Sequence, residues 1–336
     1  MSHWHSMQIP ALGLPLQRVE HNALPVPASG QVMIRVKACG VCRTDLHIID
    51  GDLPFPAYPV VLGHEVVGTV IALGPGVVSV NVGARVGVPW LGWTCGNCEA
   101  CISGHENLCE AARFTGYQIA GGYAEYAVAD ARYVFAIPPA YTDAEAAPLL
   151  CAGLIGYRAY AMAQRELQVP VLRIGLYGYG AAAHLVAQVA RHQGSEVYAF
   201  TRTGDIAAQE LARKLGAVWA GDSDKDSPQT LDAALVFAPV GALVPLALRA
   251  VRPAGVVVCA GIHMSDIPSF PYSLLWRERK LVSVANLTRA DGEAFMKIAG
   301  ETKLEVTTHC YLLTEADQAL DDLRNGRFSG AAVLIP

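Results

Sequence analysis

Residues 172–184 read Leu-Arg-Ile-Gly-Leu-Tyr-Gly-Tyr-Gly-Ala-Ala-Ala-His, an apolar strand followed by a glycine turn and the start of a helix. Gly178 would permit the tight turn, and Gly180 would let a pyrophosphate approach the N-terminus of a helix that begins near Ala181. Ala183 takes the third position of the pattern, where a small residue lets helix and strand pack closely. The stretch predicts a dinucleotide-binding turn, although glycine turns between strands and helices are also common without a ligand.

The chain beyond this turn continues to alternate between apolar strands and helical patterns. Because these strands are apolar on both faces, they predict a parallel sheet covered by helices on both sides. We therefore expect an α/β fold with a doubly wound Rossmann domain over residues 149–286. The expected strands are 171–177, 196–201, 231–238, 255–260 and 281–285, and the expected helices are 181–192, 205–215 and 242–251.

The chain before this domain has a different texture. From residue 31 to residue 139, short β-branched runs alternate with turns rich in Gly and Pro, and the loops hold most of the Cys and His. This texture predicts a β-rich domain over residues 1–148. Residues 287–336 are expected to complete it with helices near 291–299 and 314–324 and a last strand at 331–335.

The composition excludes several classes of protein. The 336 residues are 52% hydrophobic and 16% charged with a net charge of −5, and such a length favours two domains. No run reaches the roughly 18 apolar residues of a membrane span, and no basic block favours nucleic acid. The nine cysteines, an odd number without an export signal, argue against a disulfide framework. We therefore expect a cytoplasmic protein that binds neither membranes nor nucleic acid.

The end of the second Rossmann strand bears on which dinucleotide binds. An acid is expected there if the adenosine ribose is unmodified, but the strand ends in Thr201, followed by Arg202. A hydroxyl and a guanidinium would bind a 2′-phosphate, which a carboxylate would repel. This end favours NADP(H) over NAD(H); the alternative is that Arg202 is a solvated loop residue.

Four cysteines lie close together in the β-rich part, at positions 95, 98, 101 and 109. Four thiolates at this spacing can surround one tetrahedral Zn²⁺ and leave no open position, which is typical of a structural site. Four unrelated buried cysteines or an iron–sulfur cluster are the alternatives. The spacing predicts a structural zinc held by Cys95, Cys98, Cys101 and Cys109.

A second set of ligand types is dispersed. Cys42, His64 and Cys151 are separated by intervals too long to define a site. Taken singly, Cys151 would be a small core residue, and Cys39-x-x-Cys42 is equally compatible with a redox pair.

The order of these motifs resembles the zinc-dependent alcohol dehydrogenases of the medium-chain dehydrogenase/reductase superfamily. Residues 39–47 (Cys-Gly-Val-Cys-Arg-Thr-Asp-Leu-His), the Gly-His-Glu at 63–65, the four-cysteine loop and the glycine turn follow one another as they do in that family. The resemblance extends from about residue 31 to the C-terminus. It implies that the β-rich domain is GroES-like and that the substrate binds between the two domains.

The resemblance also implies a catalytic zinc, and hence two zinc ions per chain. Its ligands would be Cys42, His64 and Cys151, with an open fourth position, and Glu65 would lie behind the metal or exchange onto it. Asp45 would orient His64.

The remaining roles follow from the same resemblance. Thr44 would hydrogen-bond the substrate oxygen, and His47 would be the solvent end of a proton relay that passes the cofactor ribose. Arg43 matches a residue that contacts the pyrophosphate. Trp90 lies where the family has an aromatic wall of the substrate pocket, and Leu53 lies where some small-alcohol enzymes carry Trp.

The resemblance implies an oxidoreductase that interconverts an alcohol and its aldehyde or ketone by hydride transfer with a nicotinamide cofactor. A polyol or aryl-alcohol oxidoreductase of the same superfamily is one alternative, and a non-catalytic nucleotide-binding redox sensor is another. The family also implies a homo-oligomer, a dimer or tetramer, with the strand at 281–285 as a candidate interface.

Overall fold

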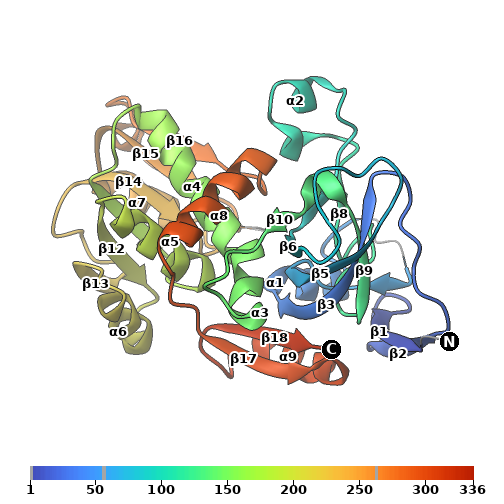
Figure 1. Cartoon of the computed structure of the whole chain (residues 1–336). Coiled ribbons are helices and arrows are strands. Elements are labelled where there is room, and N and C mark those ends of the chain that lie inside the picture. Colours follow the sequence, from blue (N-terminus) through green and yellow to red (C-terminus); the bar gives the residue numbers. More distant parts are fainter. Residues whose placement is uncertain (1–2, 55–57, 262–263) are drawn as a thin grey trace. The chain divides into compact units, whose positions relative to one another are not determined.

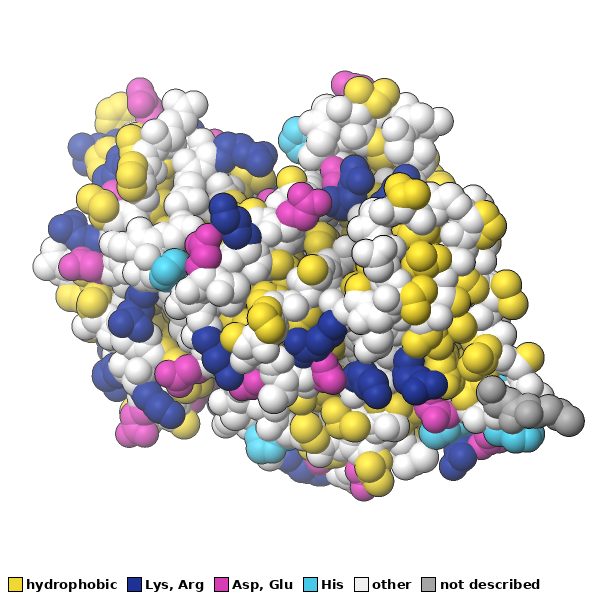
Figure 2. Space-filling model, in the orientation of Figure 1, with side chains coloured by type: hydrophobic (Ala, Val, Ile, Leu, Met, Phe, Trp, Pro, Cys, Tyr) yellow, Lys and Arg dark blue, Asp and Glu magenta, His cyan; other side chains and the backbone are white. Residues whose placement is uncertain are grey.

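The computed structural model describes residues 3–54, 58–261 and 264–336. The chain forms two compact units, Met1–Cys151 together with Leu287–Pro336, and Ala152–Asn286 (Figure 1). On the face drawn in Figure 2, acidic and basic side chains are interspersed and form no single basic patch. No single helix in the described part of the chain is long and apolar enough to span a membrane; one bent pair, Asp143–Leu150 and Ala152–Leu167, passes that test only jointly, by length and composition.

The first unit is a set of mostly antiparallel sheets. Its main sheet has the order β10-β6-β5-β3-β18-β17, with β9 also paired to β3; β2-β1-β4 and β7-β8 form smaller sheets. The strands are β1 (Trp4–Ile9), β2 (Gln17–His21), β3 (Gln31–Val41), β4 (Val60–Val61), β5 (Val66–Leu73), β6 (Arg85–Val88), β7 (Leu91–Trp93), β8 (Arg113–Phe114), β9 (Tyr126–Asp130), β10 (Phe135–Ala136), β17 (Thr308–Leu312) and β18 (Ala331–Ile335). The helices are α1 (Arg43–Asp50), α2 (Glu99–Ile102), α3 (Asp143–Ala146), α8 (Arg289–Glu301) and α9 (Ala316–Arg324), with short 3₁₀ turns η1 (Glu106–Leu108), η2 (Ala131–Tyr133), η3 (Ala147–Leu150) and η5 (Leu313–Glu315).

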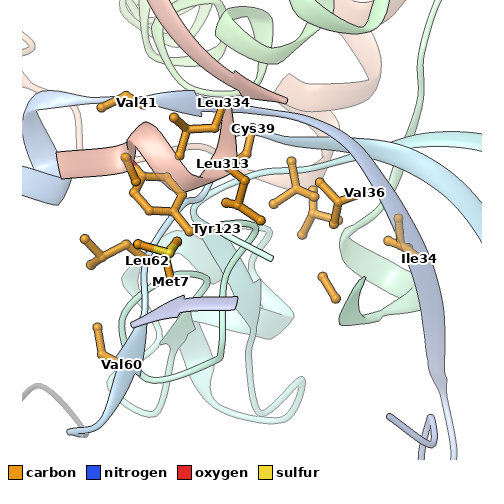
Figure 3. Packing of buried hydrophobic residues seen from close by; sticks show 14 of the residues in the cluster. Met7, Ile34, Val36, Cys39, Val41, Val60, Leu62, Tyr123, Leu313 and Leu334 are labelled. Carbon is orange, nitrogen blue, oxygen red and sulfur yellow. The ribbon is translucent and has the colours of Figure 1, made fainter. Parts of the chain in front are cut away.

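The C-terminal segment completes the core of this first unit. Strand β18 pairs antiparallel with β3, so that Leu334 lies opposite Cys39. Figure 3 shows the fully buried Tyr123 packed among Leu62, Leu313 and Leu334, which come from both ends of the chain. Burial of these apolar side chains ties residues 287–336 to the N-terminal part of the unit.

The second unit is a six-stranded parallel sheet with the order β13-β12-β11-β14-β15-β16. Its strands are β11 (Arg173–Tyr177), β12 (Glu196–Thr201), β13 (Trp219–Asp222), β14 (Leu231–Val236), β15 (Val251–Cys259) and β16 (Lys280–Ser283). Its helices are α4 (Ala152–Leu167), α5 (Ala181–His192), α6 (Ile206–Lys214) and α7 (Leu243–Ala250), with a 3₁₀ turn η4 (Tyr272–Leu274). The order reverses beside β11, which is the switch point at which ligands bind in such sheets.

The sequence patterns predicted an α/β protein with a Rossmann sheet and a β-rich domain, and the family resemblance implied that this domain is GroES-like; the fold class is confirmed. Helix α5 has the predicted bounds. The patterns missed helix α4, the short strand β13 and helix α1, which lies in a segment read as loops and strands. Residues 223–230, which join β13 to β14, contain no helix, so the alternation of strands and helices is interrupted there.

Candidate active site

The dispersed ligand types meet at one place in the first unit. Cys42 ends the β3 segment and precedes α1, His64 and Glu65 lie in the loop between β4 and β5, and Cys151 follows η3. The ligand atoms of the four residues all lie within 4.8 Å of one another, and the two sulfurs are 3.7 Å apart. Zn–S bonds of about 2.3 Å in a tetrahedron put two sulfurs about 3.8 Å apart, so this spacing suits zinc.

His64 has the unsatisfied ring nitrogens that a metal site would need. Its side chain is completely buried, and neither ring nitrogen has a hydrogen-bond partner among the described residues. Its Nδ1 lies 3.4 Å from Oδ1 of Asp45, which is longer than an ordinary hydrogen bond. Buried imidazoles without partners are costly, and a metal bound at Nε2 would satisfy the ring.

Asp45 is fixed by contacts on both sides. The Cys42 backbone N–H donates to Asp45 Oδ2 at 2.8 Å, and the Tyr123 hydroxyl donates to the same oxygen at 3.2 Å. The carboxylate therefore caps the N-terminus of α1 and faces His64. One carboxylate therefore lies at both the start of the helix and the imidazole.

Glu65 lies fully inside the unit beside the two cysteines. A Cβ on Gly40 would overlap the Glu65 carboxylate, so a glycine is required at this position of the Cys-Gly-Val-Cys segment. Without a metal, burial raises the pKa of Glu65 well above its usual range. A hydrogen bond from Cys151 lowers the pKa of Cys42 well below its usual range, which favours a thiolate there.

Helix α1 also carries the two predicted relay residues. The Thr44 hydroxyl is nearly buried and lies 3.8 Å from the Cys42 sulfur. His47 follows three residues later and therefore lies on the same face of the helix. Its Nδ1 is 2.7 Å from a carboxylate oxygen of Asp52, a neighbour that the sequence patterns did not reveal. Arg43, between Cys42 and Thr44, is exposed.

Of the two predicted pocket residues, Trp90 lies beside this cluster and Leu53 lies against the core of the unit. The Trp90 ring stands edge-on to His64 at a centroid distance of 5.0 Å and stacks on Phe114 and Tyr117. Leu53 is partly buried against the core of the unit, and the Tyr117 hydroxyl donates to the carbonyl of Pro54. Trp90 is therefore the aromatic wall beside the cluster, and Phe114 and Tyr117 back it.

The four clustered cysteines converge in a lobe that contains α2 and η1. Their sulfurs all lie within 4.8 Å of one another, with Cys95 3.9 Å from Cys101 and 3.6 Å from Cys109. Backbone N–H groups of Asn97 and Cys98 lower the pKa of Cys95 to about 6, which favours the thiolate that metal binding needs. The donor set and its spacing fit one tetrahedral zinc.

The glycine turn of the second unit has the predicted geometry. Gly178 has φ +89°, its N–H donates to the Phe200 carbonyl at 2.8 Å, and a Cβ would touch Ala238. Gly180 precedes α5, and a Cβ there would meet nothing within 4 Å. Ala181 begins the helix, and Ala183, in the first turn of the helix, is buried. The N-terminus of α5 is therefore open to an anion.

At the end of β12, Thr201 and Arg202 do not both present side chains to solvent, as binding of a 2′-phosphate by the two residues would require. The Thr201 side chain is buried, and its hydroxyl accepts a hydrogen bond from Gln209 Nε2 at 3.1 Å. Arg202 is exposed and has no ion pair within the described ranges. Asp222 pairs with Thr201 in the sheet and accepts from Gln209 at 2.9 Å and from the Gly204 N–H at 3.0 Å. The sequence patterns missed this carboxylate because β13 was not recognised.

A Rossmann sheet, a GroES-like unit and two cysteine-rich chelating clusters together define a medium-chain dehydrogenase. Residues 28–139 match the family described as the alcohol dehydrogenase GroES-like domain. The chain belongs to the zinc-type medium-chain alcohol dehydrogenases, and its activity is that of an alcohol oxidoreductase.

Three relatives illustrate this membership. A probable alcohol dehydrogenase of Mycobacterium tuberculosis is 48% identical over 96% of this chain and 93% of its own length. An alcohol dehydrogenase of Geobacillus stearothermophilus is 36% identical over 95% of this chain and 96% of its own. The solved structure of a cobalt- and zinc-bound thermostable alcohol dehydrogenase from Pyrobaculum aerophilum is 26% identical and covers all of both chains, with a TM-score of 0.87.

Proposed function

We propose that the chain is a zinc-dependent alcohol dehydrogenase with one catalytic and one structural zinc. The observation that carries the proposal is His64, completely buried and without a hydrogen bond among the described residues, beside two thiols and a carboxylate. Cys42, His64 and Cys151 would hold the catalytic ion, with Glu65 as the alternative oxygen ligand. Cys95, Cys98, Cys101 and Cys109 would hold the structural ion. Metal bound to the Pyrobaculum relative supports this assignment.

The residues of α1 would move the proton. Bound zinc would supply a Lewis acid that lowers the pKa of an alcohol, and the nicotinamide would accept the hydride. The Thr44 hydroxyl, 3.8 Å from the Cys42 sulfur, would take the alcohol proton, and His47, one turn further along the same face, would release it to water. Carbonyl reduction would use the same groups in reverse.

Metal analysis combined with a substrate screen tests the zinc proposal. We expect about two equivalents of zinc per chain, and activity with alcohols or aldehydes that a chelator removes and added zinc restores. One equivalent in fully loaded protein, or full activity in metal-free protein, would contradict it.

We propose that Trp90 limits the size and shape of the substrate that can bind beside the catalytic metal. Its edge-on contact with His64 and its stacking on Phe114 and Tyr117 support a rigid wall that suits flat or unbranched alcohols. Trp90→Ala should raise kcat/KM for bulky secondary alcohols relative to primary ones. An unchanged ratio would place the substrate elsewhere.

We propose that NADP(H) is the preferred cofactor. The support is the absence of an acid at the end of β12 and the exposed, unpaired Arg202 within the described ranges. A charge-assisted contact of about 1.5–3 kcal/mol corresponds to roughly 10- to 150-fold in kcat/KM. Asp222 is the counter-argument, because its carboxylate at the neighbouring strand end could accept hydrogen bonds from an unmodified ribose.

Steady-state kinetics with both cofactors show whether Arg202 or Asp222 determines the cofactor preference. Arg202→Ala should lower kcat/KM with NADP(H) and hardly change it with NAD(H). Thr201→Asp should reverse the cofactor preference by repelling the 2′-phosphate. An NAD(H) preference in the unmodified protein that Asp222→Asn removes would show that Asp222 binds the ribose instead.

We further propose that the chain is a homo-oligomer that uses the edge of the Rossmann sheet. Strand β16 pairs only with β15 among the described strands, and Trp276, just before it, is 60% exposed. Unpaired edges beside exposed aromatic side chains favour association. Light scattering should give a dimer or tetramer, which Trp276→Glu should weaken; a monomer at micromolar concentration would contradict this.

A further inference from the structure

The C-terminus of helix α1 returns the chain to His47. Gly51 adopts the left-handed conformation, with φ +79° and ψ 18°, and ends the helix. The next residue, Asp52, donates its backbone N–H to the His47 carbonyl at 2.9 Å. Such glycine caps place the following residue over the last turn. The turn thus brings the Asp52 side chain to the same residue that its backbone contacts.

The Asp52 carboxylate also contacts the His47 ring. Its Oδ2 lies 2.7 Å from His47 Nδ1, a short distance typical of a charge-assisted hydrogen bond. The His47 side chain is 18% exposed and the Asp52 side chain 47% exposed, so the pair lies at the surface with the imidazole mostly covered. Asp52 thus makes two hydrogen bonds with His47: its backbone N–H donates to the His47 carbonyl, and its carboxylate accepts from the ring and fixes the orientation of the imidazole.

The chemistry of the pair decides which ring nitrogen carries hydrogen. An ionised carboxylate can only accept hydrogen bonds, so Nδ1 must be the donor. The neutral ring then has its lone pair on Nε2, which is the nitrogen that can take up a proton. When Nε2 is protonated, the resulting imidazolium keeps its hydrogen bond to Asp52, and the proton is lost again from Nε2 to water.

A second carboxylate nearby does not make this contact. Asp50, on the last turn of α1, is held by Arg324 of α9 through two hydrogen bonds of 2.7 and 2.8 Å. That guanidinium lowers the pKa of Asp50. Asp50 therefore supplies a neighbouring charge of the same sign, bound to a different partner.

We propose that Asp52 is a positioning residue that holds His47 in the Nδ1–H tautomer, so that Nε2 accepts the proton released by alcohol oxidation. The inference rests on the proposed relay role of His47 and adds the group that sets its tautomer. Gly51 takes part through the backbone, because only its turn places Asp52 over His47.

The test compares Asp52→Asn with Asp50→Asn, which removes the same charge from the same helix end without touching the ring. An asparagine amide can donate to Nδ1 and thereby favour the unproductive Nε2–H tautomer. Asp52→Asn should lower kcat for alcohol oxidation about two- to fivefold, the size expected for a half-exposed carboxylate contact, with little change in KM for the alcohol. Asp50→Asn should leave kcat unchanged, and Asp52→Glu should retain most of it.

Two readouts separate positioning from a general structural effect. In protein labelled with ¹⁵N at histidine only, long-range ¹H–¹⁵N correlation should show the Nδ1–H form for His47 in the unmodified and Asp50→Asn proteins, and its loss in Asp52→Asn. His47→Asn identifies the signal. Added imidazole buffer should restore kcat in Asp52→Asn, because a small base can then carry the proton.

The outcomes are distinct. An unchanged His47 tautomer or an unchanged kcat in Asp52→Asn, while His47→Asn is impaired, would overturn the inference and leave the relay proposal standing. An unimpaired His47→Asn protein would overturn the relay itself, and the inference with it.

Discussion

The two cysteine clusters of the first unit are built in opposite ways. Cys42, His64, Glu65 and Cys151 come from three separate segments, and two of them are completely enclosed by the core. Cys95, Cys98, Cys101 and Cys109 lie within fifteen residues of one another, and only Cys109 of the four is buried. The first cluster therefore owes its geometry to the fold, whereas the lobe has little apolar packing, so we expect its folding to depend on a bound metal. Loss of metal should affect chemistry at the first site and stability at the second.

Removing a ligand from the enclosed cluster should have the largest effect. Cys42→Ser replaces a thiolate by a poor zinc ligand, so kcat should fall by about 10³-fold or more, as expected when a main electrostatic group is lost. The melting temperature should hardly change, because the surrounding core holds the segment. Zinc analysis should show one equivalent lost. Strong destabilisation would show that this site, too, depends on its metal for folding.

Replacing Thr44, beside that cluster, should lower turnover nearly as much without loss of metal. Thr44→Val keeps the shape of the side chain but removes the hydroxyl, so turnover should fall by roughly 10²-fold, as is typical of a lost acid–base group. Thr44→Ser is the matched control and should be tolerated. Steady-state kinetics at full zinc occupancy measure both; equal kcat for the Val and unmodified proteins would remove Thr44 from the relay.

The same ligand substitution in the lobe should act on stability instead. Cys98→Ser should lower zinc content by one equivalent and the melting temperature by roughly 4–12 °C, corresponding to about 2–3 kcal/mol. Cys310→Ser, at an exposed cysteine outside both clusters, is the control and should change neither quantity. Calorimetry with metal analysis checks this. A normal melting temperature in zinc-depleted Cys98→Ser protein would remove the contrast between the clusters.

The smallest effect should come from the contact that anchors the lobe. Glu106 of η1 is 5% exposed and accepts hydrogen bonds from the Arg289 backbone N–H at 2.9 Å and from its guanidinium at 3.3 Å. Arg289→Ala leaves a largely buried carboxylate with fewer partners, at a cost of about 1 kcal/mol or roughly 2–4 °C. Arg327→Ala, at a surface ion pair, should cost less. Equal shifts would mean that the anchor adds nothing beyond a surface contact.

Sequence patterns predicted those features of the structure whose residues lie close together in the chain. Helix α5 follows from spacing alone, because its hydrogen bonds join residues a few positions apart. The glycine turn at Gly178 was also predicted from spacing, although its N–H donates to the carbonyl of Phe200 on the next strand. The four-cysteine lobe is local in the same sense. Long-range geometry was not accessible in this way: Cys42, His64 and Cys151 gained meaning only from the family resemblance.

Sequence patterns did not predict the position of the Thr201 side chain or the presence of helix α1. Thr201 was expected to face the cofactor, but Gln209 on α6 holds its hydroxyl within the unit, a contact that no single strand encodes. Helix α1 was missed because it is short and its polar residues, Thr44, Asp45 and His47 among them, interrupt any helical apolar period. The C-terminus of α1 nonetheless has a sequence signal, because Gly51 directly after the helix is typical of a glycine cap.

Helix α1 also constrains how this segment can vary in length. Its eight residues, Arg43–Asp50, rise about 12 Å between the caps Cys42 and Gly51, and each residue turns the helix by about 100°. Deleting or inserting one residue between Thr44 and His47 would rotate the imidazole away from the hydroxyl, while the metal ligand would stay in place. Substitutions on the exposed side of this helix should therefore be tolerated far better than any insertion or deletion, and alignments of functional relatives should show no gap between Cys42 and Asp52.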